Sequence, residues 1–152
     1  HIDENHRQQH YFSSLERNTS GIIPNFLERI TVNSLIDPPA MVVRRSVYEQ
    51  LGGFRPELYG ASDLEMWRRI AVRYPVWFEP QVLAHFRIHS TSQTSSLVRS
   101  GKNIADMRQS IEVTRSYLPQ PISDRLVKRA MEECALYALR NAFRALSRGD
   151  IS

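Results

Sequence analysis

Residues 52–69, with the sequence GGFRPELYGASDLEMWRR, constrain the fold of this chain more than any other stretch. The pair Gly52-Gly53 favours the left-handed backbone that ends a helix, so we expect a helix over residues 46–51 to stop there. A second helix is predicted from residue 62 to residue 74, because Trp67 and Ile70 recur at the spacing of one apolar helix face. The stretch therefore predicts a helix, a glycine turn, a loop and a second helix.

The start of the second predicted helix carries side chains suited to chemistry. Ser62 or Asp63 is expected to cap the free N–H groups of the first turn, and Glu65 suits the positive end of the helix. From spacing alone, Asp63 is either a plain cap or a carboxylate that faces a cleft. The arginines are expected to form the solvent side of this helix: Arg68, Arg69 and Arg73.

A second informative stretch covers residues 82–96, VLAHFRIHSTSQTSS. Residues 82–89 read as a strand, and side chains two apart on a strand point the same way. His85, Arg87 and His89 are therefore expected on one polar side, opposite an apolar face. Residues 91–100 are rich in hydroxyl groups and read as a loop, either a flexible linker or a segment that faces phosphate.

The remaining pattern is helical, with a few short strands. Further strands are expected at residues 40–43 and 76–78. Further helices are expected at residues 25–30, 102–117 and 123–147. These elements predict a helix-rich α/β fold with short strands and a helical C-terminal tail.

Composition narrows the class of protein. Apolar content of 41% and charged content of 24% in 152 residues are those of an ordinary globular protein. A single cysteine, Cys134, excludes an internal disulfide and a cysteine-based zinc site. The net charge of +4 comes mostly from arginine, which favours phosphate and carboxylate partners. No DNA-reading helix, finger or aromatic RNA platform is recognisable, so no nucleic acid partner is expected.

Three motifs in order resemble the family-2 glycosyltransferases, which transfer sugars from nucleotide-sugar donors on a GT-A fold. The motifs are RRSVYEQLGGF at residues 44–54, ASDLEMWRR at residues 61–69 and RIHSTSQT at residues 87–94. The last fits the family pattern R-x-H-x-x-S-x-S, with Thr94 in the final hydroxyl place. The resemblance covers about residues 33–119 and implies the C-terminal half of such a catalytic domain.

The resemblance implies roles for individual side chains in inverting glycosyl transfer, whereas the residues alone leave Asp63 as a possible cap and His89 as a hydrogen-bonded histidine at a strand end. The implied roles are Asp63 as the catalytic base; Tyr59, Ser62 and Glu65 at the acceptor; Arg87, Ser92 and Thr94 at the diphosphate; and His89 at a metal. A divalent metal, Mg or Mn, is expected in the full-length enzyme, and this fragment on its own need not bind it.

The donor side of such an enzyme is not in this sequence. The chain contains no Asp-x-Asp motif and no βαβ stretch for uridine, both of which precede the matching region in the family. We therefore expect a polar lead-in at residues 1–20, an acceptor-side half at residues 21–100 and a helical tail packed on it at residues 101–152. The fragment is expected to transfer no sugar without the missing upstream half, and to be cytoplasmic, with a possible peripheral place at the inner face of the membrane.

The last predicted helix is apolar around much of its girth and requires a large partner surface. That partner is the chain's own domain, a second copy in a homodimer, or an absent part of a longer chain. The same feature supports an alternative function, a non-catalytic helical interaction module.

Overall fold

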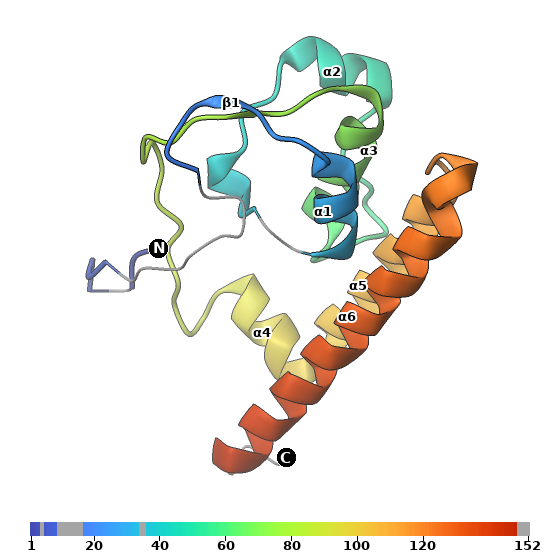
Figure 1. The fold of residues 1–152 in the computed structure, drawn as a ribbon. Helices are drawn as coiled ribbons and strands as arrows, with labels where there is room; N and C mark the ends of the chain where they lie inside the picture. Colours follow the sequence, from blue (N-terminus) through green and yellow to red (C-terminus); the bar gives the residue numbers. More distant parts are fainter. Residues whose placement is uncertain (4, 9–16, 34–35, 149–152) are drawn as a thin grey trace.

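The computed structural model describes residues 1–3, 5–8, 17–33 and 36–148 and shows a helix-rich α/β arrangement (Figure 1). The helices in these ranges are α1 (Phe26–Val32), α2 (Arg45–Leu51), α3 (Ser62–Arg73), α4 (Gln93–Ser100), α5 (Lys102–Arg115) and α6 (Gln120–Arg148), with a short 3-10 turn at Pro38–Ala40. The strands β1 (Gly21–Ile22) and β2 (Trp77–Phe78) pair in antiparallel fashion.

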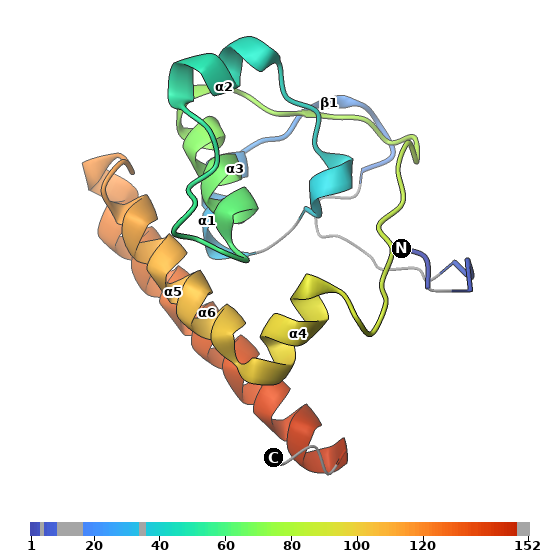
Figure 2. The same ribbon diagram turned by 180° about the vertical axis from the view of Figure 1, so that it is seen from behind.

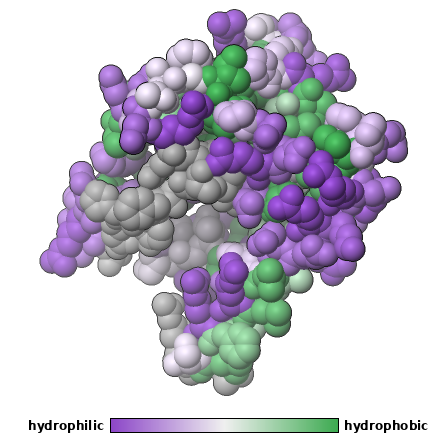
Figure 3. Space-filling model, in the orientation of Figure 1, coloured by the Kyte–Doolittle hydropathy of each residue, from purple (hydrophilic) through white to green (hydrophobic). Residues whose placement is uncertain are grey.

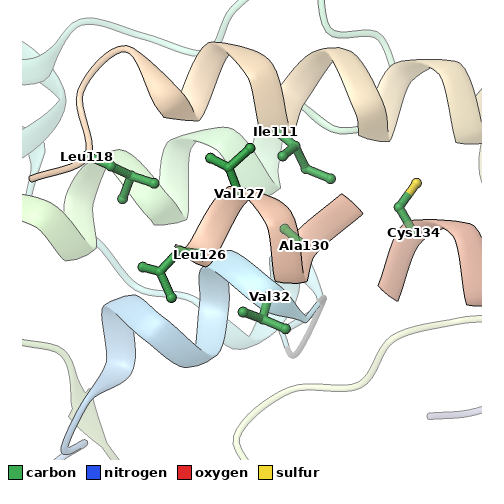
Figure 4. Packing of buried hydrophobic residues seen from close by; sticks show 7 residues of the cluster. All are labelled: Val32, Ile111, Leu118, Leu126, Val127, Ala130 and Cys134. Atoms are coloured by element: carbon green, nitrogen blue, oxygen red, sulfur yellow. The ribbon is translucent and has the colours of Figure 1, made fainter. Parts of the chain in front are cut away.

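The larger helices pack as two pairs, α1 with α3 and α5 with α6, and the two pairs lie against each other. The helices α5 and α6 run side by side as a hairpin, and they lie against α1 and α3 in both views (Figures 1 and 2). A core of seven buried residues joins these elements, drawn from α1, α5, α6 and the turn between the last two (Figure 4). They are Val32, Ile111, Leu118, Leu126, Val127, Ala130 and Cys134.

A second core lies between α1, α3 and the small sheet. Its buried residues are Ile23, Phe26, Ile30, Met66, Trp67 and Ile70. Trp67 and Ile70 are 2% and 5% exposed, which confirms the apolar face predicted for α3. Gly52 ends α2 with a φ of +81°, a positive value that side chains beyond glycine rarely adopt.

Residues 101–148, in the expected helical tail, share a core with residues before the expected boundary at residue 100, because Val32 packs with side chains of α5 and α6. Gly101, with a φ of +69°, separates α4 from α5 as a sharp turn, and α5 then packs on α3. The division of the chain into separate functional parts stays a prediction. Residues 4 and 9–16 of the expected lead-in lie outside the described residues.

Most helices were predicted correctly, and their ends less so. The predicted N-cap position of α3 is wrong, because α3 begins after Ala61, which makes no side-chain cap, although Asp63 accepts the first-turn N–H of Leu64; α2 begins after Arg44. Residues 91–100 were predicted as a loop, but they contain α4. Ser92 caps this helix by accepting the N–H of Ser95 at 3.1 Å, which explains why the hydroxyl-rich sequence folds there.

Two of the three predicted strands are wrong. Ala40 ends the 3-10 turn, and residues 41–43 follow it without a pairing partner in the described chain. Residues 82–89 make only one isolated bridge there, between Arg87 and Ile2. A strand requires a neighbouring backbone, and the local pattern cannot supply one. The third prediction, residues 76–78, is confirmed in β2, while β1 was not predicted.

Arg68 corrects the predicted solvent side of α3. Its side chain is 3% exposed, and its Nε and Nη1 donate to the carbonyl of Ile30 at 3.3 Å and to Oγ of Ser110 at 2.7 Å. Ile30 lies in the last turn of α1, where the partial negative charge of the helix end favours a cation. Arg68 therefore ties α3 to α1 and α5 from inside the protein.

Candidate functional site

Asp63 lies in the first turn of α3, half-buried, with its Oδ1 accepting the N–H of Leu64 at 2.7 Å. Within the described chain this carboxylate forms no ion pair. Burial raises the pKa of Asp63 above its ordinary value and the charge of Asp37 adds to the rise, while the N–H of Leu64 and the charge of Arg68 oppose it. A half-exposed carboxylate with a raised pKa is a stronger proton acceptor than an ordinary aspartate.

Glu65, two residues further along, has a different environment. Its side chain is fully buried, and its two oxygens contact Nε of Arg55 at 3.2 Å and Nη2 of Arg69 at 2.9 Å. Arg69 also donates to the carbonyls of Leu51 and Gly53, at 2.7 and 2.8 Å. Glu65 therefore has no surface to offer an acceptor, which corrects its predicted contact role: it holds the glycine turn against α3.

The loop before α3 is fastened from the opposite side by Asp106 of α5. Its carboxylate accepts the N–H groups of Tyr59 at 3.1 Å and of Gly60 at 2.6 Å. A Cβ at position 60 would lie 2.6 Å from Cδ1 of Leu97, so the end of the Leu97 side chain would have to shift if Gly60 were replaced. Tyr59 itself is 70% exposed, as an acceptor-contacting side chain requires.

Phe54, at the other end of this loop, is 50% exposed. Its ring stands edge-on to that of Trp67, with centroids 6.1 Å apart, and it also contacts the ring of Tyr48. An aromatic surface therefore borders the glycine turn.

Hydrogen bonds through α4 link the loop before α3 to the segment that ends at His89. Gln93 donates to the carbonyl of Tyr59 at 3.3 Å, and Oγ of Ser95 donates to the carbonyl of His89 at 2.9 Å. Asp37, whose charge acts on Asp63, contacts Nε2 of His1 at 2.5 Å, and the His1 ring lies 5.4 Å from that of Phe86.

The backbone around residues 86–88 is held by the first residues of the chain. The N–H of Ile2 donates to the carbonyl of Phe86, and the N–H of Ile88 donates to that of Ile2, each at 2.9 Å. His85 and Arg87 are exposed while Phe86 and Ile88 are half-buried, so the expected alternation holds over these four residues. It fails at residues 82–84, which are all exposed, and at His89, which is half-buried.

The residues expected at a diphosphate and a metal lie along one segment. Nη2 of Arg87 lies 3.1 Å from Nε2 of His6, and Nδ1 of His89 lies 3.1 Å from Oγ1 of Thr91. Ser92 is engaged as the cap of α4, and Thr94 is exposed in its first turn. Ser62 is half-buried in the first turn of α3 beside Asp63.

His89 has no ready-made set of fellow ligands in the described chain, where no three side chains of the types His, Cys, Asp and Glu gather to hold a metal. A metal at His89 would need ligands from outside the described residues. A shallow surface hollow occurs between α5 and α6, lined by Ala105, Arg108, Gln109, Glu112 and Met131. None of the predicted site residues lines it.

Sequence reasoning missed two carboxylates of this region. Asp106 follows Tyr59 by 47 residues, and no local pattern marks it as the anchor of that loop. Asp37 precedes two prolines and reads as the end of a loop, so its electrostatic effect on Asp63 is visible only in the fold.

Comparison with known proteins finds a match for about half of the chain in one longer protein. Over 77 residues, 51% of the chain, it is 29% identical to an uncharacterized protein of Mycobacterium tuberculosis (strain CDC 1551 / Oshkosh). The match covers 24% of that protein, so the chain spans about a quarter of the length of this relative. No family model and no solved structure matches the chain. Among the described residues, no helix has the length and apolar character needed to span a membrane.

Proposed function

We propose that this chain is the C-terminal, acceptor-side portion of an inverting family-2 glycosyltransferase with a GT-A fold. Its partners are a nucleotide-sugar donor, a hydroxyl acceptor and an upstream half of the catalytic domain. The proposal draws on the order of the three motifs at residues 44–54, 61–69 and 87–94. The longer relative is in keeping with an upstream half, and its name assigns no activity.

The observation that carries the proposal is the contrast between the two carboxylates at the start of α3. Glu65 is buried and forms ion pairs with Arg55 and Arg69, whereas Asp63 is half-exposed and forms no ion pair among the described residues, although the more distant charge of Arg68 acts on it. A structural carboxylate is stabilised by partners, and a general base needs an accessible lone pair and a raised pKa. Asp63 has the properties of the second kind.

In the proposed reaction Asp63 takes the proton of the acceptor hydroxyl as that oxygen attacks the anomeric carbon. A new carbon–oxygen bond forms, the bond to the diphosphate breaks, and a nucleoside diphosphate leaves. Arg87 and the first turn of α4, with Ser92 and Thr94, offer positive charge and N–H groups to the departing diphosphate. A divalent cation, Mg or Mn, would supply further charge, with His89 as one ligand.

The acceptor side of the proposed site is the loop before α3. Asp106 holds the backbone of Tyr59 and Gly60, which leaves the Tyr59 ring exposed beside the entry to α3. An aromatic ring at such a position suits the apolar face of a sugar. Ser62 lies next to Asp63 and offers a hydroxyl for orienting the acceptor.

The test is Asp63→Asn in the full-length protein that contains this chain. Release of nucleoside diphosphate from a panel of nucleotide sugars should fall by about 10²–10⁴-fold, the usual contribution of a general base. Asp124→Asn is the matched control, because Asp124 is an exposed carboxylate that pairs with Arg115 at a helix start. Unchanged turnover in Asp63→Asn, with measurable wild-type activity, would refute the role of Asp63.

The exposed apolar side chains on the second half of α6 favour a second candidate function, a non-catalytic helical interaction module. Such a module would be indifferent to Asp63→Asn and would release no nucleoside diphosphate from any donor. A nucleic acid partner stays unexpected, and a homodimer through α6 stays a prediction that sedimentation of the full-length protein tests.

A further inference from the structure

The second half of α6 presents an apolar stripe, formed by Leu136, Leu139, Phe143 and Leu146. Their exposed fractions are 44%, 56%, 69% and 57%, which is unusual for four large apolar side chains on one helix. Between Ala135 and Ser147 no side chain is buried, so this half of α6 extends beyond the core that contains Leu126 and Val127. The lower projection of the molecule, where α6 ends, carries the corresponding hydrophobic patch (Figure 3).

The stripe is continuous and faces outward. The spacings of three, four and three residues place the four side chains on one face, and Ala135 and Ala142 are exposed as well. Tyr137 and Ala138, which are half-buried, lie on the side that turns toward the body of the protein. Tyr137 meets α5 there, where its hydroxyl accepts from Nδ2 of Asn103 at 3.3 Å.

The charges along the length of the stripe are cations. Arg140 and Arg144 are exposed, and the sequence from residue 134 to residue 148 contains no Asp or Glu, although the exposed Glu132 lies one turn before Leu136. The first turn of α5, which reaches Tyr137 through Asn103, adds the exposed Lys102. An apolar face that carries two exposed arginines along its length fits an occupant that combines hydrocarbon with negative charge.

A second copy of the chain fits this pattern less well. An antiparallel pair that sets Leu136 against Leu146 and Leu139 against Phe143 brings the Arg140 side chains of both copies to the same edge. A parallel pair gathers Arg140 and Arg144 of both copies within two turns. Either arrangement sets like charges together beside an apolar seam, which is destabilising.

We propose that the second half of α6 is an interfacial anchor that binds an anionic lipid bilayer. The helix lies flat on the surface, Leu139 and Phe143 enter the boundary between headgroups and acyl chains, and Arg140 and Arg144 contact anionic headgroups. The helix from residue 135 to residue 147 is about 20 Å long at the usual helical rise, enough to lay the whole stripe on the bilayer. This anchor does not depend on the proposed sugar transfer.

The experiment is vesicle flotation of the full-length protein. The probes are vesicles of phosphatidylcholine alone and of phosphatidylcholine with about one third phosphatidylglycerol. We expect binding to the second vesicles and much weaker binding to the first. The double variant Arg140→Gln/Arg144→Gln should weaken binding by about fivefold for each arginine, and added salt should weaken it as well. Phe143→Ser should weaken it by at least about tenfold.

The matched control is Lys128→Gln/Arg129→Gln, which removes the same charge from exposed positions of α6 before the stripe. It should bind as the wild type does, and circular dichroism should show unchanged helix content in every variant. The proposal is overturned if no vesicle is bound, or if both vesicle types bind equally and the Arg140→Gln/Arg144→Gln variant is unaffected. It is also overturned if sedimentation shows a dimer that Phe143→Ser dissociates while vesicles are ignored.

Discussion

Glu65 offers the sharpest test of how residues 52–69 are held together. The variant Glu65→Gln keeps the size of the side chain and removes its charge, which leaves Arg69 and Arg55 facing a neutral amide. Glu65 is fully buried, and the side chain of Arg69 is 15% exposed, so little water is available to replace the lost partner. Breaking a buried ion pair from one side costs about 3–5 kcal/mol.

The expected loss is near the lower end of that range, about 3 kcal/mol, because the side chain of Arg55 is 38% exposed and Arg69 keeps its two carbonyl acceptors. With a urea m-value of about 2 kcal/mol per molar, the unfolding midpoint should fall by about 1.5 M. The melting temperature should fall by about 6–12 °C for a chain of this size.

The measurement is urea unfolding followed by far-ultraviolet circular dichroism. The control is Glu57→Gln, because Glu57 contacts the same guanidinium, at Nη1 of Arg55 and 3.1 Å, from an exposed position. It should leave the midpoint unchanged, since exposed pairs contribute little. A Glu65→Gln midpoint equal to that of Glu57→Gln would refute the argument that burial makes this ion pair important.

Three further predictions concern the site. Asp106→Asn should weaken two charge-assisted hydrogen bonds by about 1–2 kcal/mol together, seen as faster hydrogen exchange at the N–H groups of Tyr59 and Gly60 with the α5–α6 core unaffected. Gly60→Ala should cost about 1–3 kcal/mol by its clash with Leu97, and Leu97→Ala in the same chain should recover part of that loss in thermal unfolding. Asp63 has a pKa raised by burial, so its protonated form is favoured in the folded state. Its contribution to stability is therefore full below the ordinary aspartate pKa and is lost as pH rises through the raised value. Asp63→Asn should accordingly be more stable than the wild type at neutral pH in urea unfolding, with the difference shrinking toward low pH; a difference that grows toward low pH would contradict this.

The helices were predictable where the information is local. The spacing of Trp67 and Ile70 marked the buried face of α3, and the Gly52-Gly53 pair marked the end of α2, because both depend on neighbours along the chain. Helix α4 was missed although Ser92 and Gly101 bound it as cap and stop. The hydroxyl-rich sequence between them predicted a loop. The helix forms nevertheless, because Ser92 caps its first turn and Gly101 ends it.

The strands and the buried charges were not predictable in the same way. Residues 82–89 have the composition of a strand, but pairing depends on a second backbone that the local pattern does not contain. Arg68 reads as a solvent residue by helical spacing. It is buried because the carbonyl of Ile30 and the hydroxyl of Ser110 meet it there, and both lie about forty residues away in the sequence.

The sequence predicted which segments form the candidate site, but it did not predict the role of each residue there. Tyr59 and Asp63 are accessible, as a site requires, and the structure ties their loop to the segment that ends at His89. The roles depend on partners from distant elements, such as Asp106 on α5 and Asp37 before α2. A sequence motif therefore indicates the region of a site, and tertiary packing determines which residues of that region have a structural role.

The two acidic residues of α3 show how this decision bears on function. A carboxylate that serves the fold lowers its energy by gathering donors, as Glu65 does with Arg55 and Arg69. The pKa of Asp63 is raised, chiefly by burial and in part by the charge of Asp37, so its charged form at neutral pH is disfavoured in the folded state. A fold gains nothing from such a residue, and a neutral asparagine would serve the first turn equally well. The energetic cost of Asp63 is therefore the reason to look for a reaction at this position, and glycosyl transfer is the reaction that the neighbouring motifs favour.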